Sequence, residues 1–223
     1  MAGSTTRFVN GCVNADKTSP YGSFVLPSPS SCHTFFDDFD AYSSGDWDST
    51  TIGTGTISIS NGDGGIITLQ NSAAAFDGIV FNQKKEAFSL EIGKKSWFEC
   101  RIKTDTTDCS CYCGAVNSGS SLTIVSGVYF VFIDSAVGFV VQNNNSVIGG
   151  ATLSIPDLTE YTSLSFYFDG VSGFYVYVNG EYQTTVSTTL FPTETLCAGS
   201  VVYNNVDAAS SMLIDYVFLS KER

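Results

Sequence analysis

The fold class is decided by the stretch LSFYFDGVSGFYVYVNGEYQTTV, residues 164–186. Three runs rich in aromatic and β-branched residues are separated by Asp169-Gly170 and Asn179-Gly180. Asp-Gly and Asn-Gly are the dipeptides that tight hairpin turns prefer, and the flanking residue types fit a half-buried pleated surface. The stretch therefore predicts a three-strand antiparallel meander.

Similar patterns recur on both sides of this meander. Further strands are predicted at Thr56–Ser60, Ile66–Leu69, Ser96–Lys103, Val128–Ile133, Gly138–Gln142, Ser146–Ile148 and Met212–Leu219. The alternation in Ser96–Lys103 places Trp97 or Phe98 inward. One helical turn is expected near Asp157–Tyr161, after Pro156. Ten or more short strands with tight turns predict an all-β, two-sheet antiparallel sandwich with one core.

The first 34 residues differ from the rest of the chain. Pro20, Pro27 and Pro29 favour an extended backbone, yet the segment also carries apolar residues. We expect residues 1–34 to form an extended arm and residues 35–223 to form the sandwich. The arm would order against its own domain or a neighbour, through Arg7, Phe8, Val9, Tyr21, Phe24 and Leu26.

The net charge is −12, and the basic residues are unevenly placed. Six of the ten lie between Lys84 and Lys103, and none lies between Thr104 and Ser220. A surface without Lys or Arg repels a phosphate backbone, so nucleic acid is not an expected partner. Lys84, Lys85, Lys94 and Lys95 are either a docking band for an acidic partner or solvated residues that protect turns and an edge strand.

The chain has seven cysteines, an odd number, and three of them lie in the cluster Cys109-Ser-Cys-Tyr-Cys113. The first ten residues lack the apolar core of a secretory signal, and no apolar run approaches a membrane span. We expect synthesis in a reducing cytoplasm, no membrane partner, and free thiols. Cys109–Cys113 is interpreted as a reduced surface loop, with later disulfides or a four-sulfur zinc site joined by Cys100 or Cys197 as alternatives.

The sequence contains few candidate catalytic residues. Glycosidases need two facing carboxylates, and the nearest pairs are Asp38 with Asp40 and Asp46 with Asp48. The acidic residues Asp37, Asp38, Asp40, Asp46 and Asp48 are either turn-capping groups or ligands of a calcium ion.

A nucleophilic dyad would have to use His33, the single histidine. Its neighbour Cys32 points to the other side of an extended chain, so His33 is interpreted as a hinge between arm and domain. We expect no enzyme activity, no metal and no cofactor.

Two families share these motifs. Phe166–Gly170 followed by Tyr175–Gly180, with Ser96–Lys103 and Ile214–Phe218, resembles laminin-G and concanavalin A-like jelly rolls. A second resemblance, to bacteriophage virion structural proteins of the capsid decoration (cement) type, covers the whole chain. It rests on Thr6–Gly11, His33–Tyr42, Gly45–Trp47, Glu91–Lys103 and Ile214–Arg223.

These resemblances imply a two-sheet antiparallel jelly-roll sandwich with an extended N-terminal arm. They further imply a decoration protein on the phage head surface that binds the major capsid protein, self-associates as a dimer or trimer, and bridges capsid subunits. The alternative is a glycan-binding module of a tail fibre or spike, in which Trp47 and the Tyr-rich meander would stack on sugars.

Overall fold

The computed structural model describes residues 30–62, 64–104, 110–133, 136–155, 158–204 and 209–223. The described residues contain strands and connecting turns and loops, but no helix. The strands are β1 (Cys32–Asp37), β2 (Trp47–Ile52), β3 (Gly55–Gly62), β4 (Gly64–Asn71), β5 (Gly78–Gln83), β6 (Ser96–Thr104), β7 (Ser110–Val116), β8 (Gly127–Ile133), β9 (Ala136–Asn143), β10 (Ser146–Leu153), β11 (Thr162–Phe168), β12 (Gly173–Val178), β13 (Glu181–Ser187), β14 (Cys197–Tyr203) and β15 (Ser211–Glu222). Within the described ranges, no helix has the length and apolar character needed to cross a membrane.

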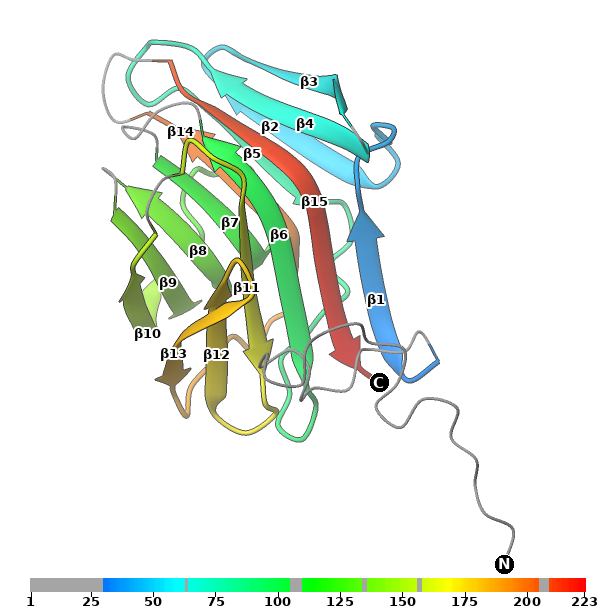
Figure 1. The fold of residues 1–223 in the computed structure, drawn as a ribbon, viewed down its shortest axis with the longest axis vertical. Coiled ribbons are helices and arrows are strands. Elements are labelled where there is room, and N and C mark those ends of the chain that lie inside the picture. Colours follow the sequence, from blue (N-terminus) through cyan, green and yellow to red (C-terminus); the bar gives the residue numbers. More distant parts are fainter. Residues whose placement is uncertain (1–29, 63, 105–109, 134–135, 156–157, 205–208) are drawn as a thin grey trace, which may run out of the picture.

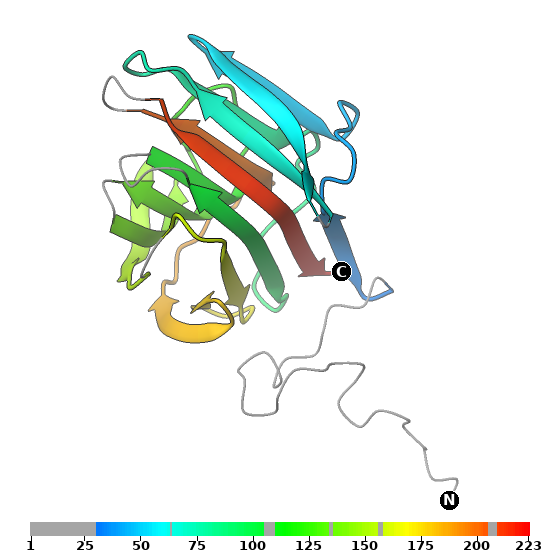
Figure 2. The same ribbon diagram turned by 45° about the horizontal axis from the view of Figure 1, so that its top comes forward.

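The strands build two stacked antiparallel sheets (Figures 1 and 2). The eight-stranded sheet has the order β13-β12-β11-β6-β15-β4-β3, and β1 pairs with the second half of β15. The seven-stranded sheet has the order β10-β9-β8-β7-β14-β5-β2. The predicted all-β, two-sheet antiparallel sandwich is confirmed.

The predicted meander is confirmed as β11, β12 and β13. Gly170, Asn179 and Gly180 have positive φ angles of 77°, 51° and 78°, the left-handed backbone that tight turns need. Asp169 fixes the first turn, because its Oδ1 accepts the backbone N–H groups of residues 171, 172 and 173. The other predicted strands also form, each with somewhat wider bounds.

Two differences from the predicted elements have a physical cause. Strands β2, β5, β7 and β14 lack a clear alternation of apolar and polar residues, and the sequence did not reveal them. The predicted helical turn is wrong for residues 158–160, which form a turn and a bend. Leu158 packs into the core there, and its carbonyl accepts the backbone N–H of Thr104, so β6 holds this segment as a loop.

The core between the sheets is one continuous hydrophobic cluster, as expected. Its centre is a set of phenylalanine rings from both sheets, with Phe166 lying 5.4 Å from Phe98 and 5.6 Å from Phe139. Phe98 is 1% exposed and points inward, so Trp97 points outward from the same strand. The core therefore fixes which side chains of each strand reach the two outer faces.

The predicted arm falls mostly outside the described residues, and so do Arg7, Phe8, Val9, Tyr21, Phe24 and Leu26. Cys32, His33 and Thr34, which were assigned to the arm, already pair with β15. His33 is therefore part of a strand rather than a hinge, and its ring lies 4.7 Å from that of Phe88. The chain enters the sandwich beside its own C-terminal strand.

Candidate binding surfaces

Asp37, at the end of β1, binds groups of the connection that follows it and of β2. Asp37 accepts the backbone N–H of Phe39 at 2.8 Å and the indole N–H of Trp47 at 2.6 Å. Asp48 is exposed and pairs with Lys84 at 3.4 Å. These contacts fit capping and surface ion pairing. In the part of the chain that the structure describes, no three His, Cys, Asp or Glu side chains are grouped to hold a metal.

Trp47 was proposed as a sugar-stacking residue, and this prediction is wrong. Its side chain is 2% exposed, and its ring stacks on Phe81 at 4.3 Å. Asp37 satisfies the indole N–H inside the fold, which allows the ring to be buried. Trp47 is therefore a core residue at the edge of the seven-stranded sheet.

The cysteine cluster is also placed differently from the prediction. Ser110–Val116 is strand β7, and Cys111 and Cys113 point into the core with no exposed surface. Cys111 and Cys113 are two residues apart and so share one face of a strand, whereas a surface loop was predicted for them. Cys111 is disulfide-bonded, so the expectation of free thiols fails there, whereas Cys32, Cys100, Cys113 and Cys197 are free and buried. Burial raises the pKa of the Cys100 thiol well above its usual value.

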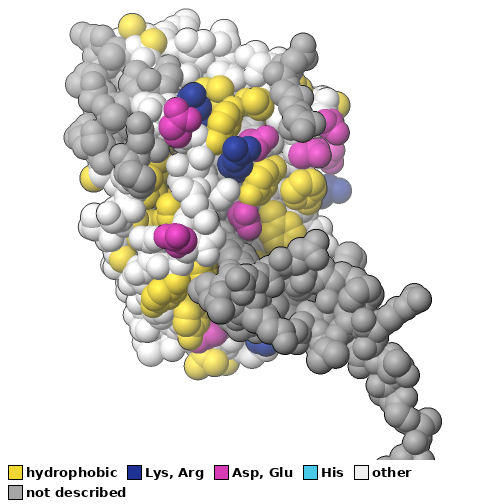
Figure 3. Space-filling model, in the orientation of Figure 1, with side chains coloured by type: hydrophobic (Ala, Val, Ile, Leu, Met, Phe, Trp, Pro, Cys, Tyr) yellow, Lys and Arg dark blue, Asp and Glu magenta, His cyan; other side chains and the backbone are white. Residues whose placement is uncertain are grey.

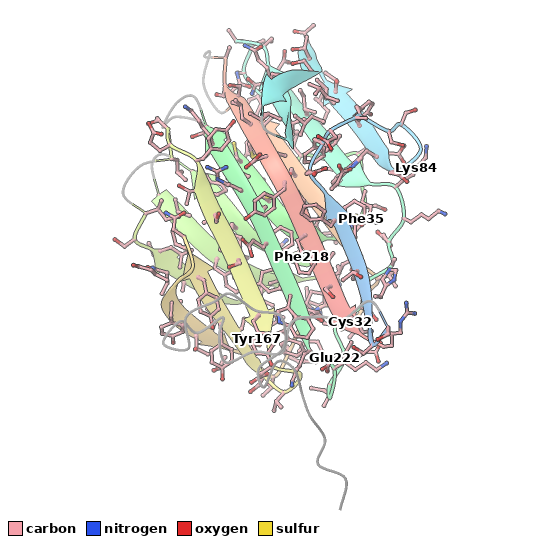
Figure 4. All side chains as sticks on the ribbon, turned by 45° about the vertical axis from the view of Figure 1, so that its right-hand side comes forward. Cys32, Phe35, Lys84, Tyr167, Phe218 and Glu222 are labelled. Atoms are coloured by element: carbon pink, nitrogen blue, oxygen red, sulfur yellow. The ribbon has the colours of Figure 1, made fainter. Side chains whose placement is uncertain are left out.

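The candidate basic band divides between the two sheets. Lys84 follows β5 in the seven-stranded sheet and donates to the carbonyl of Ser44 at 3.2 Å (Figure 4). Lys94 and Lys95 precede β6 in the eight-stranded sheet. Lys94 pairs with Glu91 at 3.2 Å, and the backbone N–H of Lys95 donates to the Glu222 carboxylate. The docking role of Lys84, Lys85, Lys94 and Lys95 stays a prediction.

The outer face of the seven-stranded sheet carries a cluster of tyrosines that the sequence did not reveal. Tyr112 from β7 stacks on Tyr203 from β14 at 5.8 Å, and their hydroxyls lie 3.0 Å apart. Tyr129 from β8 meets the Tyr112 ring edge-on at 5.5 Å. Both Tyr112 and Tyr203 are half-buried, whereas Tyr129 is 5% exposed. We call Tyr112, Tyr129 and Tyr203 the tyrosine face.

Hydrogen bonds hold this face in one arrangement. The Tyr129 hydroxyl donates to Oε1 of Gln142 at 2.6 Å, and Gln142 Nε2 donates to the carbonyl of Ile124. Burial raises the pKa of Tyr129 to about 12, and burial together with the Tyr203 hydrogen bond raises the pKa of Tyr112. The phenols of Tyr112 and Tyr129 are therefore neutral at physiological pH.

Residues 117–126, which connect β7 to β8, fold over part of the same outer face. The carbonyl of Gly119 accepts from Asn82 Nδ2 on β5 at 3.0 Å. Ile124 packs with Val116 and Tyr129, and a Cβ on Gly78 would meet Leu122 at 2.5 Å. The connection thus covers β5 and the start of β8, whereas Val131 and Val140 beside Tyr112 stay half-buried.

Charge is missing from this sheet to an unusual degree. The strands β5, β7, β8, β9, β10 and β14 contain no Asp, Glu, Lys or Arg. Asp48 on the edge strand β2 is the sheet's one charged strand residue. Because glycosidase chemistry needs two facing carboxylates, these strands do not supply its catalytic pair. The tyrosine face can offer aromatic rings, hydroxyls and amides.

The outer face of the eight-stranded sheet carries charged side chains among hydrophobic ones (Figure 3). Arg101 donates to Asp215 at 2.5 Å, and its guanidinium lies 4.8 Å from the centre of the Tyr161 ring. The Tyr216 hydroxyl donates to Glu99 at 2.6 Å. The tyrosines of the meander also point to this side. This outer face therefore combines tyrosines with charged side chains, whereas six of the seven strands of the other sheet contain no charged residue.

Comparisons with known proteins identify the fold class. No family model matches the chain, and no curated protein matches it. Among solved structures, a Bacillus licheniformis beta-glucanase superposes with a TM-score of 0.63 at 12% identity, covering 83% of this chain and 97% of that one. The Emp47p carbohydrate recognition domain gives 0.61 at 10% identity over 88% and 99%. A carbohydrate esterase of the Shiga toxin-encoding bacteriophage phi24B gives 0.52 at 14% identity over 80% and 91%.

These similarities show the fold alone, because every identity lies far below 25%. The chain has the jelly-roll sandwich of concanavalin A-like glucanases and lectin-type domains. The fold therefore resembles carbohydrate-binding and glycan-active domains, and it occurs both in enzymes and in a recognition domain.

Proposed function

We propose that this chain is a non-catalytic module of a bacteriophage particle that binds neutral glycans through the tyrosine face. The observation that carries the proposal is that the tyrosines point outward from a sheet in which six strands contain no charged residue. Tyrosine combines an apolar ring, on which a sugar ring can stack, with a hydroxyl that donates and accepts hydrogen bonds.

The lack of charge defines both the reaction class and the ligand class. Without a second carboxylate, the sheet can hold a glycan but cannot hydrolyse it by the two-carboxylate route. Without Lys or Arg between residues 104 and 220, it offers sialic acids or uronic acids no cationic partner. Neutral hexose polymers are the class that fits.

A glycan array with neutral and sialylated members tests this function. Binding to neutral glycans is expected, with about a tenfold loss of affinity in Tyr112→Ala, or about 1.4 kcal/mol. Tyr182→Ala is the matched control, because Tyr182 is an exposed tyrosine of the other sheet. Absence of any hit, or equal losses in both variants, would refute the proposal.

A second candidate function, capsid decoration, is favoured by a different observation. The segments that resemble phage virion proteins at residues 33–42, 91–103 and 214–223 lie side by side, since β1 pairs with β15 and β15 pairs with β6. A continuous surface built from all three would suit contact with a major capsid protein or with a second copy of this chain.

Copy number separates the two functions. Quantitative mass spectrometry of purified particles compares this chain with the major capsid protein. Hundreds of copies per particle support decoration of the head, whereas a handful supports a tail fibre or spike. Absence from particles contradicts both placements on the virion.

A further inference from the structure

Strand β3 forms one edge of the eight-stranded sheet (Figures 1 and 2). One side of β3 pairs with β4, and the other side pairs with no strand among the residues that the structure describes. An edge strand presents a row of backbone N–H and C=O groups that can pair with another chain. Proteins protect such edges with charged residues, proline, β-bulges or short strands. The protection of each edge therefore indicates where this fold can accept a further strand.

Every other edge strand of the described fold has a protective feature. β1 and β2 are six residues long and contain Asp37 and Asp48. β13 begins with Glu181, and its pairing with β12 shifts register. The pairing of β10 with β9 shifts register between Val147 and Gly149. β3 differs, because its eight residues include no charged residue and no proline, and it pairs with β4 in continuous register.

The isoleucines of β3 face the core, yet one of them is exposed. Ile57 is opposite Leu69 and Ile59 is opposite Ile67, and both of these β4 residues are fully buried in the core. Directly opposite residues of an antiparallel pair lie on the same face, so Ile57 and Ile59 also face inward. Ile57 packs against the core, whereas Ile59 is 40% exposed. The inner apolar layer of the sheet therefore extends to its edge, where part of it still faces water.

We propose that β3 pairs antiparallel with β3 of a second copy of this chain, across a two-fold axis at Ser58. A two-fold interface needs a self-complementary surface. The strand has one, because Thr56-Ile-Ser-Ile-Ser60 reads nearly the same in both directions. In this register Ile57 of each copy is opposite Ile59 of the other. The pairing therefore covers the exposed isoleucine with another isoleucine and places no two charges together.

The antiparallel direction follows from the two faces of the strand. A two-fold axis perpendicular to the sheet keeps the inner faces of both copies on one side, so that isoleucine meets isoleucine. Parallel pairing would turn the second copy over and place its polar outer residues, such as Ser58, beside Ile59. Exposed Thr56, Ser58 and Ser60 instead share the outer face in the antiparallel dimer.

This dimer would also place both tyrosine faces on the same side. The axis runs perpendicular to the sheets, so the seven-stranded sheets of both copies lie on one side of the extended eight-stranded sheets. Two glycan sites that point in one direction bind a repeating polymer more tightly than one site, because the second binding step becomes intramolecular. This consequence rests on the proposed glycan function, whereas the dimer itself does not.

Sedimentation velocity of the full chain without glycan, over a wide concentration range, tests the dimer. The wild type is expected to shift from monomer to dimer as its concentration rises. Ser58→Lys puts two like charges directly opposite each other across the axis and is expected to weaken the dimer about tenfold. Ser58 is exposed, so the change removes no packing from the monomer. Ser187→Lys, at an exposed serine of the opposite edge strand β13, is the matched control and should dimerise like the wild type.

Charge reversal separates lost pairing from lost folding. Ser58→Glu is also expected to weaken the dimer, whereas an equimolar mixture of Ser58→Lys and Ser58→Glu chains should restore it, because opposite charges then face each other. A wild type that stays monomeric at every concentration overturns the proposal. So does a dimer that Ser58→Lys leaves unchanged, or a mixture that dimerises no better than its components. A monomeric wild type that still binds neutral glycans would refute the dimer and leave the glycan proposal intact.

Discussion

The two outer faces of this sandwich use the same residue type in opposite ways. On the seven-stranded sheet, tyrosines stand in strands without charge and are partly covered by the connection of residues 117–126. On the eight-stranded sheet, tyrosines lie among charged pairs such as Arg101 with Asp215, and the Arg101 guanidinium also faces Tyr161. Charged surroundings, more than aromatic content, therefore distinguish the two outer faces.

The largest expected effect comes from the core on which both faces depend. Phe166→Ala removes a ring that packs between the sheets and leaves a cavity, at a cost of about 3–5 kcal/mol in the free energy of unfolding. Urea-induced unfolding measures the loss. Phe36→Ala, at a ring that is 59% exposed, should change stability by less than about 0.5 kcal/mol. Equal losses in the two variants would contradict the assignment of the core.

A glycine beneath the tyrosine face offers a way to disturb one face alone. A Cβ on Gly114 would lie 2.4 Å from the backbone of Tyr129, so Gly114→Ala must displace β8. We expect a loss of about 1–3 kcal/mol and weaker glycan binding. Gly119→Ala is the control, because its Cβ meets no atom within 4 Å. Thermal unfolding and array binding check both variants, and a neutral Gly114→Ala would show that the sheet adapts freely.

The smallest effect concerns the end of the eight-stranded sheet. Hydrogen bonds from Lys221, then from Ser89 and Lys94, lower the pKa of Glu91 from 4.5 to about 2. Because the folded pKa is depressed, this carboxylate contributes stability above about pH 4.5 and loses that contribution as the pH falls toward 2. Glu91→Gln should therefore destabilise the protein slightly at pH 7, and the difference from the wild type should vanish near pH 2.

Unfolding curves at several pH values measure this dependence. Glu181→Gln, at an exposed position of β13, is the control. A destabilisation by Glu91→Gln that stays constant from pH 7 to pH 2 would contradict the role of the Glu91 carboxylate.

Local sequence signals predicted the fold better than they predicted the faces. Asp169-Gly170 and Asn179-Gly180 determine their turns within a few residues, so the meander was predictable. In β7, the Cys-x-Cys spacing followed the strand period, but its alternating residues gave no contrast between apolar and polar sides. The burial of Trp47 depends on Asp37, a partner ten residues away that only the folded chain brings into contact.

The candidate binding residues needed long-range information for a similar reason. Tyr112 and Tyr203 are 91 residues apart and meet only through the register of β7 with β14. Trp97 and Tyr167, 70 positions apart in the sequence numbering, likewise meet only through the pairing of β6 with β11. The sequence pattern supplied tyrosine-rich strands, and pairing alone decided which tyrosines share a surface.

Hydrogen–deuterium exchange of the full chain, with and without the neutral oligosaccharide that gives the strongest array signal, tests the division between the two faces most directly. We predict slower exchange in β7, β8 and β14, which carry the tyrosine face, and unchanged exchange in β6, β11 and β15. Protection confined to β6, β11 and β15, with β7 and β14 unaffected, would contradict the account and move the ligand to the other sheet.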